Sequence, residues 1–394
     1  MERIRFVRVA VNVEQLLYRA PGGVGRYTAK LVTLLPRLFP DDTVIGFTAR
    51  HRDTEISEVA KQLGPDQMGG SARVVRLPLP RPVLYDSWHL TGLPKLGWMS
   101  SDLRGIDVVH APSVAVPPRN RARLVVTIHD LAPLLFPETF PARGRRFHAQ
   151  GIRAAARRAD LVITVSEAAA AEILDHTSIP PGRLRVVPNG VDLMPADDAT
   201  IQDTLTSHGL GDVPYVLWVG SLEPRKNVGV LVSAFARLLA AEPDLPHRLV
   251  LVGPSGWLDA DLLPAADQRA LGDRLVRIGL LEEVELRSVY AGADLFAFPS
   301  RHEGFGLPVL EAMAQGTPVV CGDIPALREV SGGAARLVPP GDVDAWEAAL
   351  RELLVDRAGR TALEDAGRLR ASQFGWERSV RATRAVYAEA MELG

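Results

Sequence analysis

Short runs of β-branched and other apolar residues alternate along this chain with longer stretches that are rich in alanine and leucine. Seven runs occupy the first half, at residues 7–13, 43–48, 74–77, 107–110, 124–128, 161–165 and 184–187, and five occupy the second, at 215–219, 248–252, 275–278, 295–298 and 318–320. Such runs are typical of buried strands, and their alternation with helical stretches predicts parallel sheets flanked by helices. Two series of this kind predict an α/β protein with two Rossmann-like domains.

The boundary between the two predicted domains lies in a segment that contains none of these strand-like runs. Residues 192–212 are polar and acidic and contain no strand-like run, so we expect one domain over residues 1–192 and a second over residues 193–375. A chain of 394 residues fits two domains of ordinary size. The closing segment 376–394 is predicted to be an amphipathic helix, with one face formed by Trp376, Val380, Thr383 and Tyr387.

The composition narrows the classes of function. A formal net charge of −2 gives no overall attraction to nucleic acid, and we expect no nucleic-acid partner. The single cysteine, Cys321, lies in an apolar run, where a buried thiol is expected rather than a reactive one. Arginines interrupt the apolar residues at the start of the sequence, unlike a secretory signal, and no apolar stretch reaches the roughly 18 residues of a membrane span. These features predict a cytoplasmic protein.

The segment SRHEGFGLPVLEAMAQGTPVV predicts an anion-binding turn ahead of a helix. It follows a predicted strand, and Pro308 suits the first helical position because proline has no amide hydrogen. The backbone N–H groups of Phe305, Gly306 and Leu307 would then point outward at the positive end of the helix, where phosphate binds readily. Gly316 is expected to end the helix.

The same segment contains two carboxylates, Glu303 before the turn and Glu311 in the helix. Either could accept hydrogen bonds from sugar hydroxyls. Equally, Glu311 could complement the helix dipole and Glu303 could be a solvated loop charge.

A second cluster, GSLEPRKN, also follows a predicted strand and places Arg225 and Lys226 close to Gly220. Adjacent cations ahead of a helix suit a diphosphate, because arginine offers a fork of donors and lysine a point charge. A solvated surface pair is the alternative interpretation.

The first half contains a glycine-rich stretch, APGGVGRY, that could let the backbone approach a phosphate or a sugar. It does not match the dinucleotide fingerprint, because Gly-x-Gly-x-x-Gly counted from Gly23 would require glycine at Thr28. An ordinary tight turn fits nearly as well.

Further candidates in the first half are His129 and Asp130, at the carboxyl end of a predicted strand. A lone histidine is more often structural, but this end of a parallel sheet is where such folds bind ligands. The stretch 83–98 contains aromatic residues, including Tyr85 and Trp88, that suit sugar or lipid faces or else the core.

The stretch 142–158 is rich in arginine, with Arg143, Arg145, Arg146, Arg153, Arg157 and Arg158. Basic residues near an anionic membrane surface contribute about 1 kcal/mol each, so this stretch is a candidate for peripheral membrane contact. A solvated helix face is the alternative.

Two Asp-x-Asp sequences, at residues 259–261 and 342–344, resemble metal motifs. Neither closes a predicted strand beside the phosphate-binding loops, so we expect no essential metal and no cofactor.

Together these segments resemble the retaining glycosyltransferases of family 4, which are built on the GT-B fold. The likeness covers nearly the whole chain, and its most specific element is the spacing of Glu303 and Glu311, in order with GSLEPRKN, HD, VVPNGVD and EGFGLPVLEAMAQGTPVV. The resemblance implies two Rossmann-like domains facing across a cleft, with the last helix crossing back to the first domain. The first domain would bind the acceptor and the second the nucleotide sugar.

The resemblance also implies roles for individual residues. The catalytic set would be His129, Arg225, Lys226 and Glu303. The donor-binding residues would be Gly23, Gly220, Arg225, Lys226, Ile278, Glu303, Phe305, Gly306, Leu307 and Glu311. The acceptor-binding residues would be Arg26, Tyr27, Asp130, Tyr85 and Trp88. Many relatives have arginine or lysine where this chain has Ser221, which leaves one expected phosphate contact open.

The sequence therefore predicts a retaining glycosyltransferase that moves a hexose from a nucleoside-diphosphate sugar, with GDP-mannose favoured, to a glycan or lipid-linked acceptor. We expect a front-face mechanism, because no carboxylate is an obvious nucleophile. A nucleotide-sugar epimerase, a phosphorylase and a non-catalytic partner subunit remain as alternatives.

Overall fold

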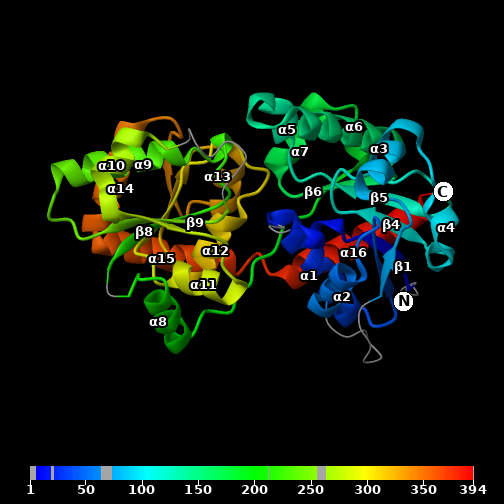
Figure 1. Ribbon diagram of the computed structural model, residues 1–394, viewed down its shortest axis with the longest axis horizontal. Coiled ribbons are helices and arrows are strands. Elements are labelled where there is room, and N and C mark those ends of the chain that lie inside the picture. Colours follow the sequence, from blue (N-terminus) through cyan, green and yellow to red (C-terminus); the bar gives the residue numbers. More distant parts are fainter. Residues whose placement is uncertain (1–5, 19–21, 64–72, 212, 255–262, 394) are drawn as a thin grey trace. The chain divides into compact units, whose positions relative to one another are not determined.

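A computed structural model of the protein describes residues 6–18, 22–63, 73–211, 213–254 and 263–393 (Figure 1). The chain forms two compact units: unit 1 comprises Met1–Gly190 with Trp376–Gly394, and unit 2 comprises Val191–Gly375. Each unit contains one parallel sheet, with helices on both sides of it in Figure 1.

The sheet of unit 1 has the strand order β3-β2-β1-β4-β5-β6-β7. Its strands are β1 (Arg8–Asn12), β2 (Thr43–Thr48), β3 (Val74–Arg76), β4 (Val108–Ala111), β5 (Arg123–Thr127), β6 (Leu161–Thr164) and β7 (Leu184–Val186). The helices are α1 (Gly22–Leu38), α2 (Asp53–Gln62), α3 (Arg81–Thr91), α4 (Leu96–Met99), α5 (Ala132–Leu135), α6 (Ala142–Arg158), α7 (Glu167–His176) and α16 (Trp376–Glu392).

The sheet of unit 2 has the strand order β10-β9-β8-β11-β12-β13. Its strands are β8 (Tyr215–Val219), β9 (Arg248–Val252), β10 (Leu275–Ile278), β11 (Leu295–Phe298), β12 (Val319–Gly322) and β13 (Arg336–Val338). The helices are α8 (Asp198–Ser207), α9 (Val228–Ala241), α10 (Ala265–Leu271), α11 (Glu283–Ala291), α12 (Leu307–Gln315), α13 (Pro325–Ser331), α14 (Val343–Val355) and α15 (Arg357–Ala371).

The strands agree closely with the apolar runs of the sequence. The central strands β4, β8 and β11 are buried along their whole length, as expected for parallel strands covered on both faces. Cys321 on β12 is buried, and burial raises the pKa of its thiol to about 12, so the predicted core thiol is confirmed. The sequence analysis missed β13, because only one of its three residues is buried and the segment carries no apolar run.

The division between the units differs slightly from the sequence-based boundary. Unit 2 begins at Val191, whose amide donates to the carbonyl of Phe374 at 2.6 Å, so that the two segments that cross between the units run side by side. As the sequence predicts, the described residues 192–211 contain no strand. They contain α8, whose first turn is capped by Asp197 accepting from the Thr200 amide, and α8 packs against α11 within unit 2.

The terminal helix α16, red in Figure 1, returns to unit 1 and packs against α1. Its predicted face of Trp376, Val380, Thr383 and Tyr387 is buried, as expected. Two polar contacts anchor it: the Tyr387 hydroxyl lies 2.6 Å from His110 Nδ1, and the Arg384 guanidinium lies 2.6 Å from a carboxylate oxygen of Asp42. Asp42 also accepts from the Val7 amide, so the ion pair connects α16 to the start of β1.

Replacing Arg384 with alanine is expected to lower the free energy of unfolding by about 3–5 kcal/mol, because it leaves the buried carboxylate of Asp42 without its cation. Urea unfolding followed by circular dichroism measures the change. The control is Arg237→Ala, which breaks an exposed pair with Asp344 and should cost no more than about 1 kcal/mol. Equal losses in the two variants would show that the buried pair does not anchor the helix.

Candidate functional site

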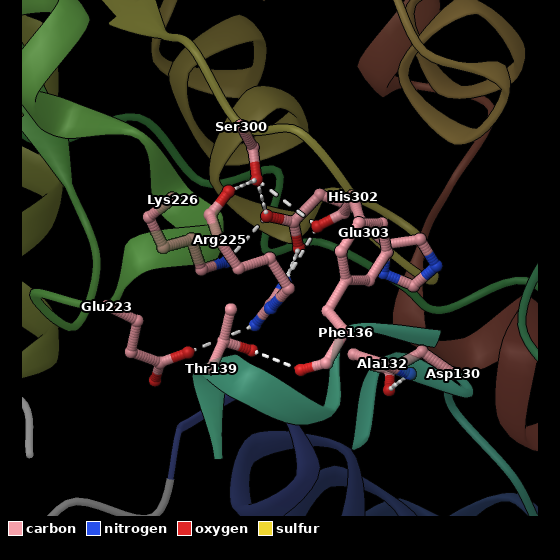
Figure 2. A network of polar contacts seen from close by, with 10 residues as sticks. All are labelled: Asp130, Ala132, Phe136, Thr139, Glu223, Arg225, Lys226, Ser300, His302 and Glu303. Carbon is pink, nitrogen blue, oxygen red and sulfur yellow. Dashed lines mark hydrogen bonds and ion pairs between the residues drawn. The ribbon is translucent and has the colours of Figure 1, made fainter. Parts of the chain in front are cut away.

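Two loops of unit 2 bring Arg225, Lys226 and Glu303 into one ionic cluster (Figure 2). The first loop follows β8 and includes a short 3₁₀ turn, η5 (Pro224–Lys226), and the second follows β11. Lys226 Nζ donates to Glu303 Oε1 at 2.7 Å, and a terminal nitrogen of Arg225 lies 3.3 Å from Glu303 Oε2. The exposed fraction of the side chain is 12% for Lys226, 11% for Arg225 and 9% for Glu303. The alternative interpretation, a solvated surface pair of Arg225 and Lys226, does not fit these largely buried side chains.

A neighbouring asparagine fixes the shape of the first loop. Asn227 adopts a left-handed conformation with φ 55°, which asparagine tolerates better than most residues. Its side-chain amide donates to the carbonyls of Pro299 and Pro340, at 3.2 and 2.5 Å. The Arg301 amide also donates to the carbonyl of Arg225. These bonds hold the loops after β8 and β11 in register. The charged residues of the sequence do not indicate this role of Asn227.

The electrostatics of the cluster keep Glu303 ionised. Burial alone would raise its pKa, but the charges of Lys226 and Arg225 and the hydrogen bonds from Lys226 and Ser300 lower the pKa from 4.5 to about 2. The Ser300 hydroxyl donates to Glu303 Oε1 at 2.5 Å. At neutral pH Glu303 is therefore an acceptor of hydrogen bonds and not a proton donor.

The second loop leads into α12 through Gly306, a position that only glycine can occupy. Gly306 has φ 106°, and a Cβ atom there would lie 2.5 Å from the Leu327 side chain. Among the described residues, the amides of Phe305, Gly306 and Leu307 have no hydrogen-bond partner. The helix start therefore leaves these three donors unused, and anion binding there stays a prediction. Pro308 occupies the second helical position and not the first, which corrects the sequence-based expectation.

Glu311 lies in the second turn of α12 and accepts a hydrogen bond from the Tyr290 hydroxyl at 3.1 Å. The first turn of α12 contains no acidic residue. Because the effect of a helix dipole falls off within the first turn, complementing the dipole is a weak explanation for this half-buried carboxylate. As predicted, Gly316 ends the helix with a positive φ.

Gly220 directly follows β8 and lies beside a second glycine, Gly253, that the sequence analysis did not single out. The Gly220 amide donates to the carbonyl of Val252, and Gly253 has φ 135°, where a Cβ atom would lie 2.1 Å from the Gly220 carbonyl oxygen. Ile278 ends β10, and its carbonyl accepts from the Gly253 amide. These backbone hydrogen bonds connect Ile278 to Gly220, and among the described residues no hydrogen bond or ion pair joins the Ile278 side chain to the ionic cluster.

In unit 1, His129 follows β5 and is held by its neighbours. Its Nε2 lies 2.9 Å from the Pro112 carbonyl, and the Tyr27 ring packs edge-on at 5.1 Å. A carbonyl can only accept, so Nε2 carries the hydrogen and Nδ1 is the acceptor in the neutral ring. Burial lowers the His129 pKa, and this effect outweighs the opposing effects of the Pro112 carbonyl and the Asp130 charge. His129 is therefore neutral at pH 7.

Three aromatic residues that were assigned to the acceptor are buried. Trp88 donates from its indole nitrogen to the Pro94 carbonyl, the Tyr85 hydroxyl donates to the buried Glu14, and Tyr27 lies 3.2 Å from Thr127. Because all three side chains are at most 4% exposed, they support the core and do not present a face to an acceptor.

The other acceptor-binding candidates remain partly exposed. Arg26, like Gly23, lies in the first turns of α1, so the described part of the glycine-rich stretch is the start of a helix and not a separate tight turn. Asp130 accepts from the Ala132 amide at 2.9 Å and so begins the short helix α5. Arg26 lies on the α-helix that follows β1 along the chain, and Asp130 lies between β5 and α5.

The Asp-x-Asp sequence at 342–344 has a structural explanation. Asp342 caps α14 by accepting from the Ala345 amide, and Asp344 pairs with Arg237. The sequence at 259–261 lies outside the described residues. In the described part of the chain, no three histidine, cysteine or acidic residues are grouped to hold a metal ion.

Comparisons with known proteins agree with this fold. The family model described as Glycosyltransferase Family 4 matches residues 21–194, and the one described as Glycosyl transferases group 1 matches residues 213–356. The O-antigen chain mannosyltransferase B of Escherichia coli is 30% identical over 358 residues, covering 90% of this chain and 93% of that protein. A D-inositol 3-phosphate glycosyltransferase of Kineococcus radiotolerans is 33% identical over 333 residues, covering 79% of this chain and 72% of that protein.

Solved structures show the same architecture. Anabaena HepE, crystallised with UDP and glucose, superposes with a TM-score of 0.72 at 18% identity, covering 97% of this chain and 100% of that chain. The fold is thus the two-domain GT-B architecture of glycosyltransferases. This chain belongs to glycosyltransferase family 4 and is a hexosyltransferase-type enzyme. In the described part of the chain, every helix is too short or too polar to cross a bilayer.

Replacing Glu303 with glutamine should destabilise unit 2 in a pH-dependent way. The Glu303 pKa is about 2 in the folded protein and 4.5 ordinarily, so its ionisation stabilises the fold fully above pH 4.5. That contribution, of the order of 1.36 kcal/mol per pKa unit, is lost as pH falls towards 2. The difference between wild type and Glu303→Gln in urea unfolding should therefore be largest near pH 6.5 and smaller at pH 3.5.

The matched control is Glu352→Gln, which removes an exposed carboxylate that pairs with Arg336. It should change the free energy of unfolding by less than about 1 kcal/mol. A Glu303→Gln effect that is equally small, or that does not change with pH, would mean that the cations do not stabilise this carboxylate.

Proposed function

We propose that this enzyme is a retaining glycosyltransferase that moves a hexose from a nucleoside-diphosphate sugar to a glycan or lipid-linked acceptor. The observation that carries the proposal is the meeting of Arg225 and Lys226 with the start of α12 and Glu303 in unit 2. Departure of the diphosphate develops negative charge, and fixed cations and helix amides stabilise such charge without reorganising. The cluster is thus suited to the leaving group.

The donor-contacting groups divide into two sets. Arg225 and Lys226, with the amides of residues 305–307, hold the diphosphate. Glu303 orients these cations and accepts from the sugar hydroxyls, while Glu311, held by Tyr290, accepts from the ribose hydroxyls. On the side of unit 1, Gly23 approaches the diphosphate and neutral His129 faces the reacting sugar. Domain closure around the donor excludes water and limits its hydrolysis.

The reaction proceeds by front-face attack. The bond between the anomeric carbon and the phosphate oxygen breaks, the acceptor oxygen bonds to the same face of that carbon, and the acceptor proton passes to the leaving phosphate oxygen. Glu303 is a poor nucleophile because two cations and the Ser300 hydroxyl already engage its oxygens. This supports a mechanism without a covalent sugar–enzyme intermediate.

GDP-mannose is the favoured donor. The Escherichia coli relative is named as a mannosyltransferase, and its similarity extends over 90% of this chain. The structural neighbour was solved with UDP and glucose, so UDP-glucose is the main competing donor. The name of the same relative, an O-antigen chain mannosyltransferase, supports the proposal of a polysaccharide or glycolipid acceptor.

Variants of Glu303 and Glu311 test the proposal that the two glutamates contact different parts of the donor, the sugar and the ribose. Glu311→Gln should weaken binding of both GDP and GDP-mannose, since it loses the ribose contact. Glu303→Gln should weaken GDP binding less than Glu311→Gln does, since Arg225 and Lys226 remain, but it should transfer sugar about 100-fold more slowly through lost orientation of the reacting carbon. Calorimetry with GDP, beside a transfer assay over a panel of nucleotide sugars, measures both effects.

Glu352→Gln serves again as the control, since it lies on α14 and pairs with Arg336. If neither site variant alters GDP binding or sugar transfer, the ionic cluster has no donor role. Product analysis of the anomeric configuration tests retention in the same assay.

We also propose that α6 contacts the membrane surface from the cytoplasmic side. Five of its six arginines, at 143, 145, 146, 153 and 157, are exposed, whereas Arg158 donates to the Trp88 carbonyl. Helix α3 packs against α6 and exposes Leu90, at 62%. Cations beside exposed apolar side chains suit an anionic bilayer.

The protein should cosediment with vesicles that contain anionic lipid and should dissociate as salt is raised. Arg145→Gln combined with Arg146→Gln should reduce the bound fraction several-fold. Arg37→Gln combined with Arg121→Gln removes the same charge from exposed positions outside α6 and should leave binding unchanged. Absence of cosedimentation at low salt would exclude the membrane contact.

A further inference from the structure

A cavity of about 700 Å³ lies in unit 1, and the site in unit 2 does not account for it. We name it the arginine cavity; its lining residues are Arg50, His51, Arg52, Glu55, Arg76, Leu77, Pro78 and Met99. Most of these residues follow the carboxyl ends of β2 and β3, the edge of a parallel sheet where ligands bind. Its volume is within the range of small-molecule sites.

The positive charge of the arginine cavity is only partly neutralised. Arg76 forms an ion pair with Asp53. By contrast, no described residue forms a hydrogen bond or ion pair with the guanidinium groups of Arg50 and Arg52, and both are exposed. The carboxylate of Glu55 is already engaged, because it accepts from the Arg52 amide at 2.9 Å. Two guanidinium groups are therefore available to an anion.

The segment that carries these arginines is fixed from beneath by a buried carboxylate. Glu14 accepts from the Ala49 amide at 3.0 Å, the Tyr85 hydroxyl at 2.9 Å and His51 Nε2 at 2.8 Å. Three hydrogen bonds to one buried carboxylate restrain the Ala49 backbone and the His51 ring. The Arg50 amide is also bonded, to the Leu79 carbonyl at 2.8 Å.

This network gives the cavity the character of a built site. Glu14 orients the His51 ring and the chain on either side of it, so Arg50 and Arg52 leave a fixed backbone. The lining also includes apolar side chains, those of Leu77, Pro78 and the half-buried Met99. A ligand that carries an anionic group next to an apolar or sugar moiety matches both kinds of side chain.

We propose that the arginine cavity binds a phosphate or diphosphate group on the acceptor, so that the acceptor substrate is a phosphorylated sugar or a polyprenyl-phosphate-linked glycan. Two arginine forks match the geometry and the double charge of a phosphate better than a single carboxylate. The inference rests on the proposed function, because only a transferase requires an acceptor.

The test compares Arg50→Gln/Arg52→Gln with wild type, using two phosphate sources. One arm titrates mannose 6-phosphate, with mannose as the uncharged comparison, by calorimetry in saturating GDP so that the donor cluster is occupied. The other arm measures cosedimentation with phosphatidylcholine vesicles with and without polyprenyl phosphate. The variant should bind at least tenfold more weakly to whichever ligand, mannose 6-phosphate or polyprenyl phosphate, carries the phosphate group of the natural acceptor.

Two further variants separate fork geometry from charge. Arg50→Lys/Arg52→Lys keeps the charge but loses the forks and should bind with intermediate affinity. Arg37→Gln/Arg121→Gln removes equal charge from exposed positions outside the cavity and should bind as wild type. Thermal unfolding of all variants confirms that exposed substitutions leave the fold intact.

Loss confined to the sugar-phosphate arm identifies a soluble acceptor, and loss confined to the vesicle arm identifies a lipid-linked one. Binding in neither arm, or binding that the cavity variant does not alter, overturns the proposal. GDP affinity, measured for the same variants, reports separately on the donor site in unit 2. The two proposals can therefore fail independently.

Discussion

The buried ion pairing of Glu303 with Lys226 and Arg225 is the constraint on which the site depends. Removing a carboxylate from water is costly, and the cost is recovered only when cations and hydrogen bonds surround it with good geometry. The loops after β8 and β11 must therefore stay in register, which explains the left-handed Asn227, its two bonds to carbonyls and the close backbone approach at Gly253. The same pairing keeps two cations oriented for a diphosphate.

Most of the fold could be predicted from the sequence because its signals are local. Buried parallel strands appear as uninterrupted apolar runs, and the apolar face of α16 appears at a helical period. The errors arose where tertiary contacts outweigh local pattern. Residues 198–207 look like a polar linker, yet α8 packs on α11, and β13 is too short and too exposed to form a pattern of its own.

The site divides in the same way. Charged residues that follow strands could be predicted, since the carboxyl ends of parallel strands share one edge of a sheet. Whether a side chain is exposed could not, because burial depends on residues distant in the chain. Tyr85 and Trp88 illustrate this: they resemble ligand-binding aromatics in the sequence, but Glu14 and Pro94 engage them within the core. Asn227, Ser300 and the network beneath Arg50 likewise become visible only in three dimensions.

The return of α16 to unit 1 has a consequence for biosynthesis. A ribosome makes all of Val191–Gly375 before it makes the helix that completes the first unit. Until then the buried His110 and Asp42 lack Tyr387 and Arg384, their partners from that helix. Domains tend to fold as units while the chain emerges, so unit 2, though second in the sequence, can reach its native state first. The nascent first unit is then the part of the enzyme most exposed to chaperones and proteases.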